Sequence, residues 1–326
     1  MSERISFDSQ LMSMTTIIET TTIKGNRSYS QQASAFYYTE RSPVEPENDG
    51  LQWWEVNRYW LVTNRHVALP QIDGIECVPY EFKFYLRKMD NQNINWSPIV
   101  LSQEELLSNL KLHRNKEIDV ALVDVTAYII RATSNEDSTQ VILPRYLSDS
   151  VLPENQPISI EVASDIIVAS YPLGFYDDVN KFPIVKSGIV ASAWGCYFKG
   201  VPIFQIDAQL FPGSSGGLVI SKPIDIAMID GELKINNTKQ FVLLGIYSGE
   251  YTWNKEIELE GKKGLLNSSF GLGNVWYSCL IPQIITNGVG YSREENQEEA
   301  PNCKSNLHSN ECKILKMLQR FCRGKK

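Results

Sequence analysis

Short apolar segments separated by polar loops recur along the chain, and their side chains alternate with the period of two that is typical of β-strands. In residues 81–89, Phe82, Phe84 and Leu86 alternate with polar residues such as Lys83. This pattern predicts a strand with one buried face and one solvated face. Further strands are predicted at residues 14–20, 34–40, 58–64, 95–101, 119–125, 164–172, 183–192, 202–208, 215–221, 241–249 and 274–281.

The predicted strands form two groups, residues 1–130 and 159–286, with about six strands in the first. Short strands at close spacing, with turn residues between them, favour an all-β barrel or sandwich. Residues 131–158 are polar, contain prolines and are predicted to connect the two groups. Residues 287–326 are predicted to form a polar linker followed by a basic amphipathic helix.

The composition is that of an ordinary globular protein, with 43% apolar and 21% charged residues. The formal net charge of −7 argues against general nucleic-acid binding. The chain begins with no apolar leader and contains no run of about 18 apolar residues, so we expect a cytoplasmic protein without membrane contact. We expect its cysteines to be reduced, and because none forms a CxxC pair we expect no zinc knuckle. We expect neither a metal nor a cofactor.

Residues 206–220 differ from the other segments because three glycines, a proline and two serines interrupt an apolar sequence. Gly213, Gly216 and Gly217 permit a tight turn and the close approach of another group. Ser215 then lies on a turn with backbone N–H groups beside it. A nucleophile next to donors for an oxyanion is what acyl transfer requires, whereas the simpler alternative is a glycine-rich hairpin turn.

A serine hydroxyl needs a base to remove its proton, usually a histidine oriented by a buried carboxylate. Of the three histidines, His113 and His308 lie in polar segments, whereas His66 ends the apolar, aromatic sequence RYWLVTNRH. Asp119 directly precedes the alternating apolar residues of DVALVDV. His66, Asp119 and Ser215 are therefore the candidate base, orienting carboxylate and nucleophile, in this chain order.

The sequences TNRHV, DVALVDV, IDAQLFPGSSGG and LLGIYSG resemble, in this order, the signature blocks of the trypsin-like serine peptidases, which have the chymotrypsin fold. In style they are most similar to the bacterial Deg-type (high-temperature-requirement) branch, which YPLGFYDDVNKFPIVKSGIVAS also resembles. The resemblance covers roughly residues 12–286. It implies two six-stranded antiparallel β-barrels with His66, Asp119 and Ser215 in the cleft between them, to which the sequence adds a short helical C-terminal tail.

The family resemblance also implies an activity and the residues that carry it. It implies a serine endopeptidase that cleaves protein or peptide substrates through an acyl-enzyme, with an oxyanion hole made by the N–H groups of Gly213 and Ser215. No acidic residue lies where a trypsin-type pocket would place one, so we expect no strict preference for Lys or Arg. The substrate-binding residues that it implies are Gln209, Leu210, Tyr247, Ser248 and Gly249, with residues 274–277 as a further wall of the specificity pocket. For Tyr247 and Trp276 the alternative is a place in the barrel core.

Deg-type proteases usually continue into a peptide-binding PDZ domain. Only about 40 residues follow the second strand group here, fewer than a typical domain requires, so we expect none.

Two alternatives to a working enzyme stay open. In the first, the protease fold is a catalytically silent or switch-regulated module that binds a peptide or protein partner. In the second, the chain acts as an adaptor through its C-terminal helix, which has Ile314, Leu318 and Phe321 on one face and basic residues elsewhere. That helix is also the expected docking site for an activating partner, unless it simply packs on the barrels.

Overall fold

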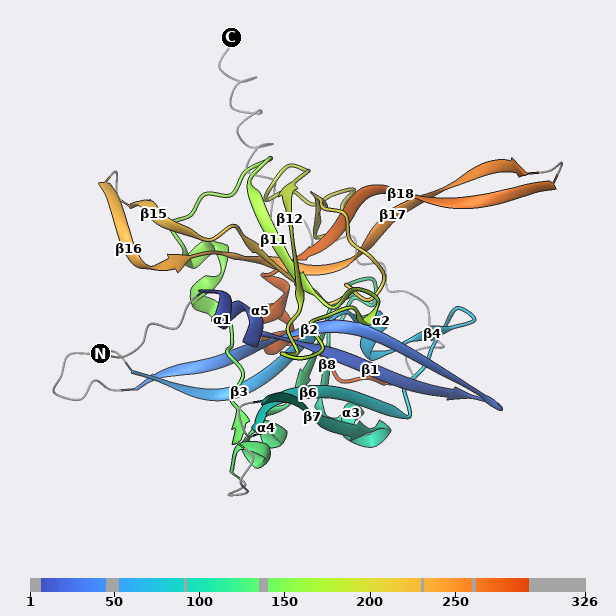
Figure 1. Ribbon diagram of the computed structural model, residues 1–326, viewed down its shortest axis with the longest axis horizontal. Coiled ribbons are helices and arrows are strands. Elements are labelled where there is room, and N and C mark those ends of the chain that lie inside the picture. The colour runs from blue at the N-terminus through green and yellow to red at the C-terminus, as the bar shows by residue number, and fades with distance from the viewer. Residues whose placement is uncertain are drawn as a thin grey trace, which may run out of the picture.

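The computed structural model describes residues 7–44, 53–90, 93–134, 140–229, 232–259 and 262–292. Strands dominate these residues and form a large N-terminal sheet and a closed C-terminal barrel (Figure 1). In Figure 1 the sheet, drawn in blue and cyan, lies below the barrel, drawn in green to orange. The all-β class predicted from the period of the apolar residues is therefore confirmed.

The N-terminal sheet has eight strands in the order β10-β6-β1-β2-β3-β9-β8, with β7 paired to β6. The alternation predicted for β6 is confirmed, because Phe82, Phe84 and Leu86 are buried while Lys83 is half-exposed. The strands are β1 (Thr15–Lys24), β2 (Arg27–Val44), β3 (Trp53–Thr63), β6 (Glu81–Asp90), β7 (Asn93–Ser102), β8 (Leu110–Leu112), β9 (Ala121–Asp124) and β10 (Gln140–Ile142).

This sheet is not the closed six-stranded barrel that the resemblance implies. Among the described strands, β7 pairs only with β6 and β8 only with β9, so the sheet is open between β7 and β8. The physical reason is a helix, α3 (Gln103–Asn109), that begins at the end of β7. Ser102 and Glu105 form a capping box there, in which each side chain accepts a hydrogen bond from the other residue's backbone N–H, and the chain turns into the helix.

The C-terminal strands form the closed six-stranded barrel that was predicted, in the order β11-β12-β13-β18-β17-β14. Its interior is apolar and includes Val168, Phe204, Ile206 and Val275. The strands are β11 (Asp165–Ser170), β12 (Ile184–Val190), β13 (Ile203–Asp207), β14 (Leu218–Ser221), β17 (Leu243–Leu259) and β18 (Lys262–Tyr277).

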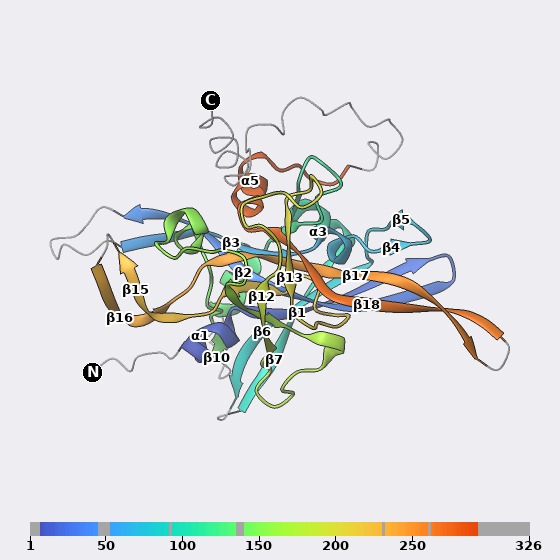
Figure 2. The same ribbon diagram turned by 90° about the horizontal axis from the view of Figure 1, so that it is seen from above.

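Two ribbons project from the barrel toward opposite ends of the molecule (Figure 2). One is the continuation of β17 and β18, which stay paired as far as Leu259 and Lys262. The other is the hairpin of β15 (Ile224–Ile229) and β16 (Glu232–Gln240). A small hairpin, β4 (Gln71–Ile72) with β5 (Ile75–Glu76), lies beside the N-terminal sheet.

The helices are few and short. Besides α3, the α-helices of the described residues are α1 (Phe7–Ser13), α2 (Arg65–Ala68), α4 (Thr126–Thr133) and α5 (Leu280–Asn287). None of the helices in the described ranges has the length and apolar character to cross a membrane. The basic helix expected near the C-terminus lies outside the described residues.

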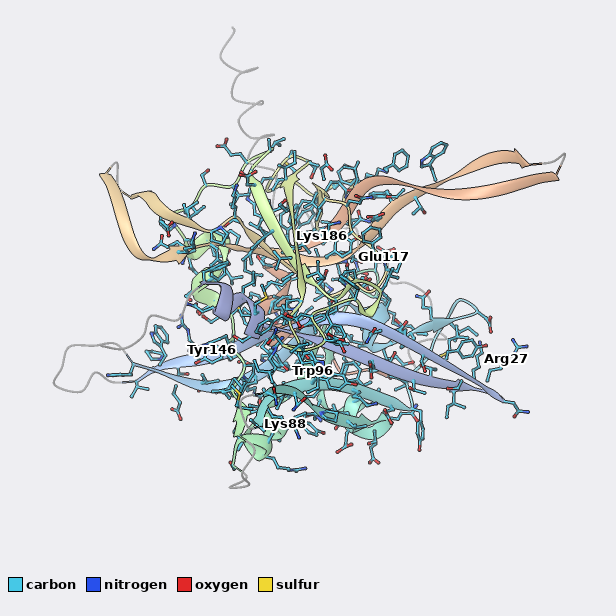
Figure 3. All side chains as sticks on the ribbon, viewed as in Figure 1. Arg27, Lys88, Trp96, Glu117, Tyr146 and Lys186 are labelled. Atoms are coloured by element: carbon cyan, nitrogen blue, oxygen red, sulfur yellow. The ribbon has the colours of Figure 1, made fainter. Side chains whose placement is uncertain are left out.

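Polar and aromatic side chains join the two halves. Arg87 of β6 is 6% exposed and donates hydrogen bonds to the Tyr171 hydroxyl (2.9 Å) and the Thr15 carbonyl (3.2 Å). Trp96 of β7, labelled in Figure 3 at the junction of the sheet and the barrel, lies 6.3 Å from the Tyr171 ring and under the Arg87 guanidinium. Since Tyr171 directly follows β11, this cluster ties the barrel to the sheet.

The described cysteines are in two chemical states. Cys77 and Cys279 are free thiols, and burial raises the pKa of the Cys279 thiol to about 11. Cys196 is disulfide-bonded, which differs from the expectation of reduced thiols throughout.

Candidate active site

The glycine-rich stretch forms a loop between β13 and β14, and Ser215 lies half-buried on it. Gly213 and Gly216 have φ angles of 90° and 79°, which side chains of other residues rarely adopt. A Cβ on Gly216 would lie 2.0 Å from the Ser34 carbonyl oxygen and 2.4 Å from Thr63 Oγ1. The glycine therefore permits β2 and β3 of the N-terminal sheet to approach the backbone next to Ser215.

The loop presents two backbone donors with fixed directions. The N–H groups of Gly213 and Ser215 donate no hydrogen bond within the described part of the chain, whereas those of Ser214, Gly216 and Gly217 do. In each trans peptide the C=O points opposite to the N–H. The carbonyl before Gly213 accepts from Leu173 N (2.6 Å), and the carbonyl before Ser215 accepts from Gly217 N (2.8 Å). Both peptides are thus held, and both N–H groups are available to a ligand.

His66 and Asp119 are in direct contact. The His66 Nδ1 atom lies 2.7 Å from Asp119 Oδ2, and the His66 backbone N–H donates to Asp119 Oδ1 at 2.9 Å. His66 lies on α2, directly after β3, and its side chain is 40% exposed, against 21% for Asp119. The carboxylate therefore holds the imidazole in one orientation and leaves its other nitrogen, Nε2, for a substrate or nucleophile.

Ser248 connects Ser215 to this pair. The Ser248 hydroxyl donates to Asp119 Oδ2 at 2.6 Å, and the Ser248 carbonyl accepts from the Ser215 hydroxyl at 2.9 Å. The three predicted residues, which are far apart in the sequence, are thus brought into one hydrogen-bonded network. In this network the Ser215 hydroxyl is directed to a carbonyl of β17, and no hydrogen bond between Ser215 and the His66 ring occurs among the described residues.

Sequence reasoning missed two residues that hold the site together. Asn64 is fully buried, donates to the Asp119 carbonyl (2.8 Å) and accepts from Gly216 N (2.6 Å). Ser34, also fully buried, donates from its N–H to the Ser215 carbonyl and from its hydroxyl to the Gly213 carbonyl, both at 2.8 Å. The position of Asn64, two residues before His66, was the one signal in the sequence, whereas nothing marked Ser34.

The predicted substrate-binding residues are not all on the surface. Gln209 is exposed and Ser248 and Gly249 are half-buried, whereas Leu210 and Tyr247 are 3% and 2% exposed and belong to the barrel interior. Burial raises the pKa of the Tyr247 phenol well above its usual range. Sequence reasoning also missed Glu250, whose carboxylate accepts from Leu210 N at 3.1 Å.

The remaining histidines and acids form no second site in the described ranges. His113 accepts a hydrogen bond from Asn115 N, and burial lowers the pKa of its imidazole. His308 lies outside the described residues. The part of the chain that the structure describes contains no group of three or more His, Cys, Asp or Glu side chains arranged to hold a metal ion.

Comparison with known proteins identifies a family for this chain. The family model of the trypsin-like peptidase domain matches residues 48–223, which include His66, Asp119 and Ser215. Among solved structures, the chain is similar to the active form of the Rv3671c protease from M. tuberculosis, with 12% identity and a TM-score of 0.39, over 86% of this chain and 83% of that one. No curated protein matches the sequence.

Proposed function

Since the chain belongs to the trypsin-like peptidase family, we propose that it is a serine endopeptidase that hydrolyses peptide bonds through His66, Asp119 and Ser215. The observation that carries the proposal is the network in which Ser248 joins the Ser215 hydroxyl to the Asp119 carboxylate, which in turn contacts His66. A serine, a histidine and an aspartate gathered in one site, next to two backbone N–H groups that have no acceptor among the described residues, are the groups that acyl transfer uses.

In the proposed reaction His66 Nε2 takes the proton from Ser215 as Oγ attacks the carbonyl carbon of the peptide bond. The N–H groups of Gly213 and Ser215 donate to the oxyanion that forms. His66 then protonates the leaving nitrogen and the C–N bond breaks, which leaves an ester on Ser215. A water molecule attacks this ester with His66 again as base, so the acid product leaves and the serine is restored.

The Ser215 hydroxyl must first change its hydrogen-bond partner. It donates to the Ser248 carbonyl, and a rotation about its side chain is needed to direct it to the imidazole. A neutral hydrogen bond of this kind contributes about 0.5–1.5 kcal/mol, so substrate binding can readily offset its loss. Catalytic hydrogen bonds that are loose without substrate often form in the substrate complex.

The same observation favours the second candidate function, a protease-fold module that is catalytically silent or regulated by a switch. A hydroxyl held by Ser248 is not activated, so a silent protein would keep it there. The two candidate functions differ in whether the Ser215 hydroxyl ever attacks a peptide bond. A cytoplasmic location stays a prediction. An activating partner at the C-terminal helix also stays a prediction, because that helix lies outside the described residues.

Cleavage of a peptide library tests the proposal. The wild type and Ser187→Ala, which alters an exposed serine on β12, are expected to cut the same peptides. Ser215→Ala is expected to lower the rate by at least about 10³-fold, because the nucleophile is removed. Equal cleavage by Ser215→Ala and the wild type would contradict serine catalysis at this position.

A further inference from the structure

The side chain of Tyr247 occupies the interior of the barrel directly behind the nucleophile loop. Its backbone pairs with that loop, since Gly216 N donates to the Tyr247 carbonyl (2.8 Å) and Tyr247 N donates to the Gly217 carbonyl (3.0 Å). The side chain is 2% exposed and packs in the same apolar cluster as Leu210. The backbone of Tyr247 is therefore held against the loop of Ser215, which also limits where its aromatic ring can lie.

The ring fills the space beside β18. A Cβ built on Gly273 would lie only 2.7 Å from Tyr247 Cε2, so the aromatic ring touches the backbone of β18 at this glycine. Gly273 pairs with Ile206 on β13 and with Glu250 on β17. The ring thus packs in one apolar cluster with Leu210, Val275 and Tyr277, which belong to the segments predicted to bound the specificity pocket.

Glu250 closes the same region from the outside. Its Oε1 atom accepts from Leu210 N at 3.1 Å and its Oε2 atom from the Ser269 hydroxyl at 2.5 Å. The Glu250 carboxylate therefore links β17, by its hydrogen bond with Leu210 N, to the segment that leads into the nucleophile loop. The charge of Glu250 adds to burial in raising the pKa of the Tyr247 phenol, which agrees with a carboxylate close to the ring.

We infer that this peptidase cleaves after small residues, glycine, alanine or serine, because Tyr247 fills the specificity pocket and Glu250 lies across its mouth. This inference rests on the proposed serine endopeptidase activity. A large side chain before the scissile bond would have to displace a ring that is packed inside the barrel, and interiors at native packing density have no free volume to receive it. A small residue needs no such displacement.

The test compares peptides that differ only in the residue before the scissile bond: glycine, alanine, valine, leucine and phenylalanine. For the wild type we expect kcat/KM to be larger for alanine than for phenylalanine by on the order of 10²-fold. In Tyr247→Ala, which empties the pocket, the ratio of phenylalanine to alanine is expected to rise by at least about tenfold. Tyr247→Phe is the matched control, since it keeps the ring, and it is expected to keep the preference for small residues.

Labelling of Ser215 by a fluorophosphonate, measured on each protein, separates the two claims. A wild type that is labelled but cuts after phenylalanine as well as after alanine overturns the inference and leaves the proposed function intact. A labelled wild type that cuts none of the peptides also counts against it. A wild type that is not labelled overturns the proposed function itself. If Tyr247→Ala does not fold, the wild-type profile together with that of Tyr247→Phe decides the question.

Discussion

The hydroxyl of Ser248 donates a 2.6 Å hydrogen bond to Oδ2 of Asp119. The same oxygen lies 2.7 Å from His66 Nδ1, so one carboxylate oxygen serves both the imidazole and a strand of the barrel. Because Asp119 precedes β9 of the N-terminal sheet and Ser248 lies on β17 of the barrel, this contact fixes the distance between the two halves at the candidate site. The orientation of His66 therefore depends on how the halves are docked.

Ser248→Ala removes this contact without touching the three residues assigned to catalysis. We expect kcat to fall by roughly tenfold with little change in KM, because a donor to the charged carboxylate contributes about 1.5–3 kcal/mol and part of this loss is recovered by water. Steady-state kinetics on one peptide measures it. Ser248→Thr keeps the hydroxyl and is expected to retain most of the activity, and equal losses in both variants would show that the hydroxyl has no role.

Ser34→Ala is expected to loosen the nucleophile loop. The hydroxyl donates to the Gly213 carbonyl and accepts from Tyr171 N at 2.9 Å, so the variant leaves two buried polar groups without a partner. We expect the free energy of unfolding to fall by about 1–3 kcal/mol and kcat to fall as well.

Chemical denaturation and kinetics measure these two effects of Ser34→Ala. The control is Ser30→Ala, at an exposed serine on the same strand, for which the change is expected to stay within about 0.5 kcal/mol. Equal stabilities of the two variants would contradict the account of the Ser34 contacts.

Glycine is required at one position of the site and not at another. In Gly216→Ala the new methyl group would meet the Ser34 carbonyl at 2.0 Å on a backbone with φ of 79°, so we expect a loss of activity and of more than about 2 kcal/mol in stability. Gly249 has no heavy atom within 4 Å of the corresponding position, and Gly249→Ala is expected to fold with nearly unchanged stability. Thermal unfolding of both variants measures this difference in stability. A Gly216→Ala protein as stable as Gly249→Ala would refute the close approach of β2 to the backbone at Gly216.

Alkaline pH is expected to weaken the barrel through Tyr277. Burial raises the pKa of its phenol to about 12, while the hydroxyl accepts from Gly195 N and donates to the Cys196 carbonyl, both at 3.0 Å. A folded-state pKa above the unfolded value near 10 means that this stabilisation is complete below pH 10 and is lost as the pH rises toward 12.

The free energy of unfolding, measured from pH 9 to 12, is therefore expected to fall more steeply for the wild type than for Tyr277→Phe, which cannot ionise at this position. Parallel pH profiles for the two proteins would show that the Tyr277 phenol ionises as readily in the folded state as in the unfolded one.

The sequence could predict the residues whose local pattern is distinctive. Gly213 and Gly216 stand out in an apolar segment, His66 follows a predicted strand and Asp119 begins one, so these residues were found. Ser34 and Glu250 could not be found in this way, because their contacts depend on how distant strands pair and dock. The closure of the N-terminal strands was wrongly expected for a similar reason, since the capping box at Ser102 ends β7 and β7 does not pair with β8.

The central claim is that Ser215 is a nucleophile activated by His66. Its most direct test is to treat the wild type, Ser215→Ala and His66→Gln with a fluorophosphonate and to locate the adduct by mass spectrometry of the digested protein. We expect one adduct, on Ser215 of the wild type, that forms at least about 10²-fold more slowly in His66→Gln and does not form in Ser215→Ala. An adduct that forms equally fast in all three proteins, or on a different serine, would contradict it.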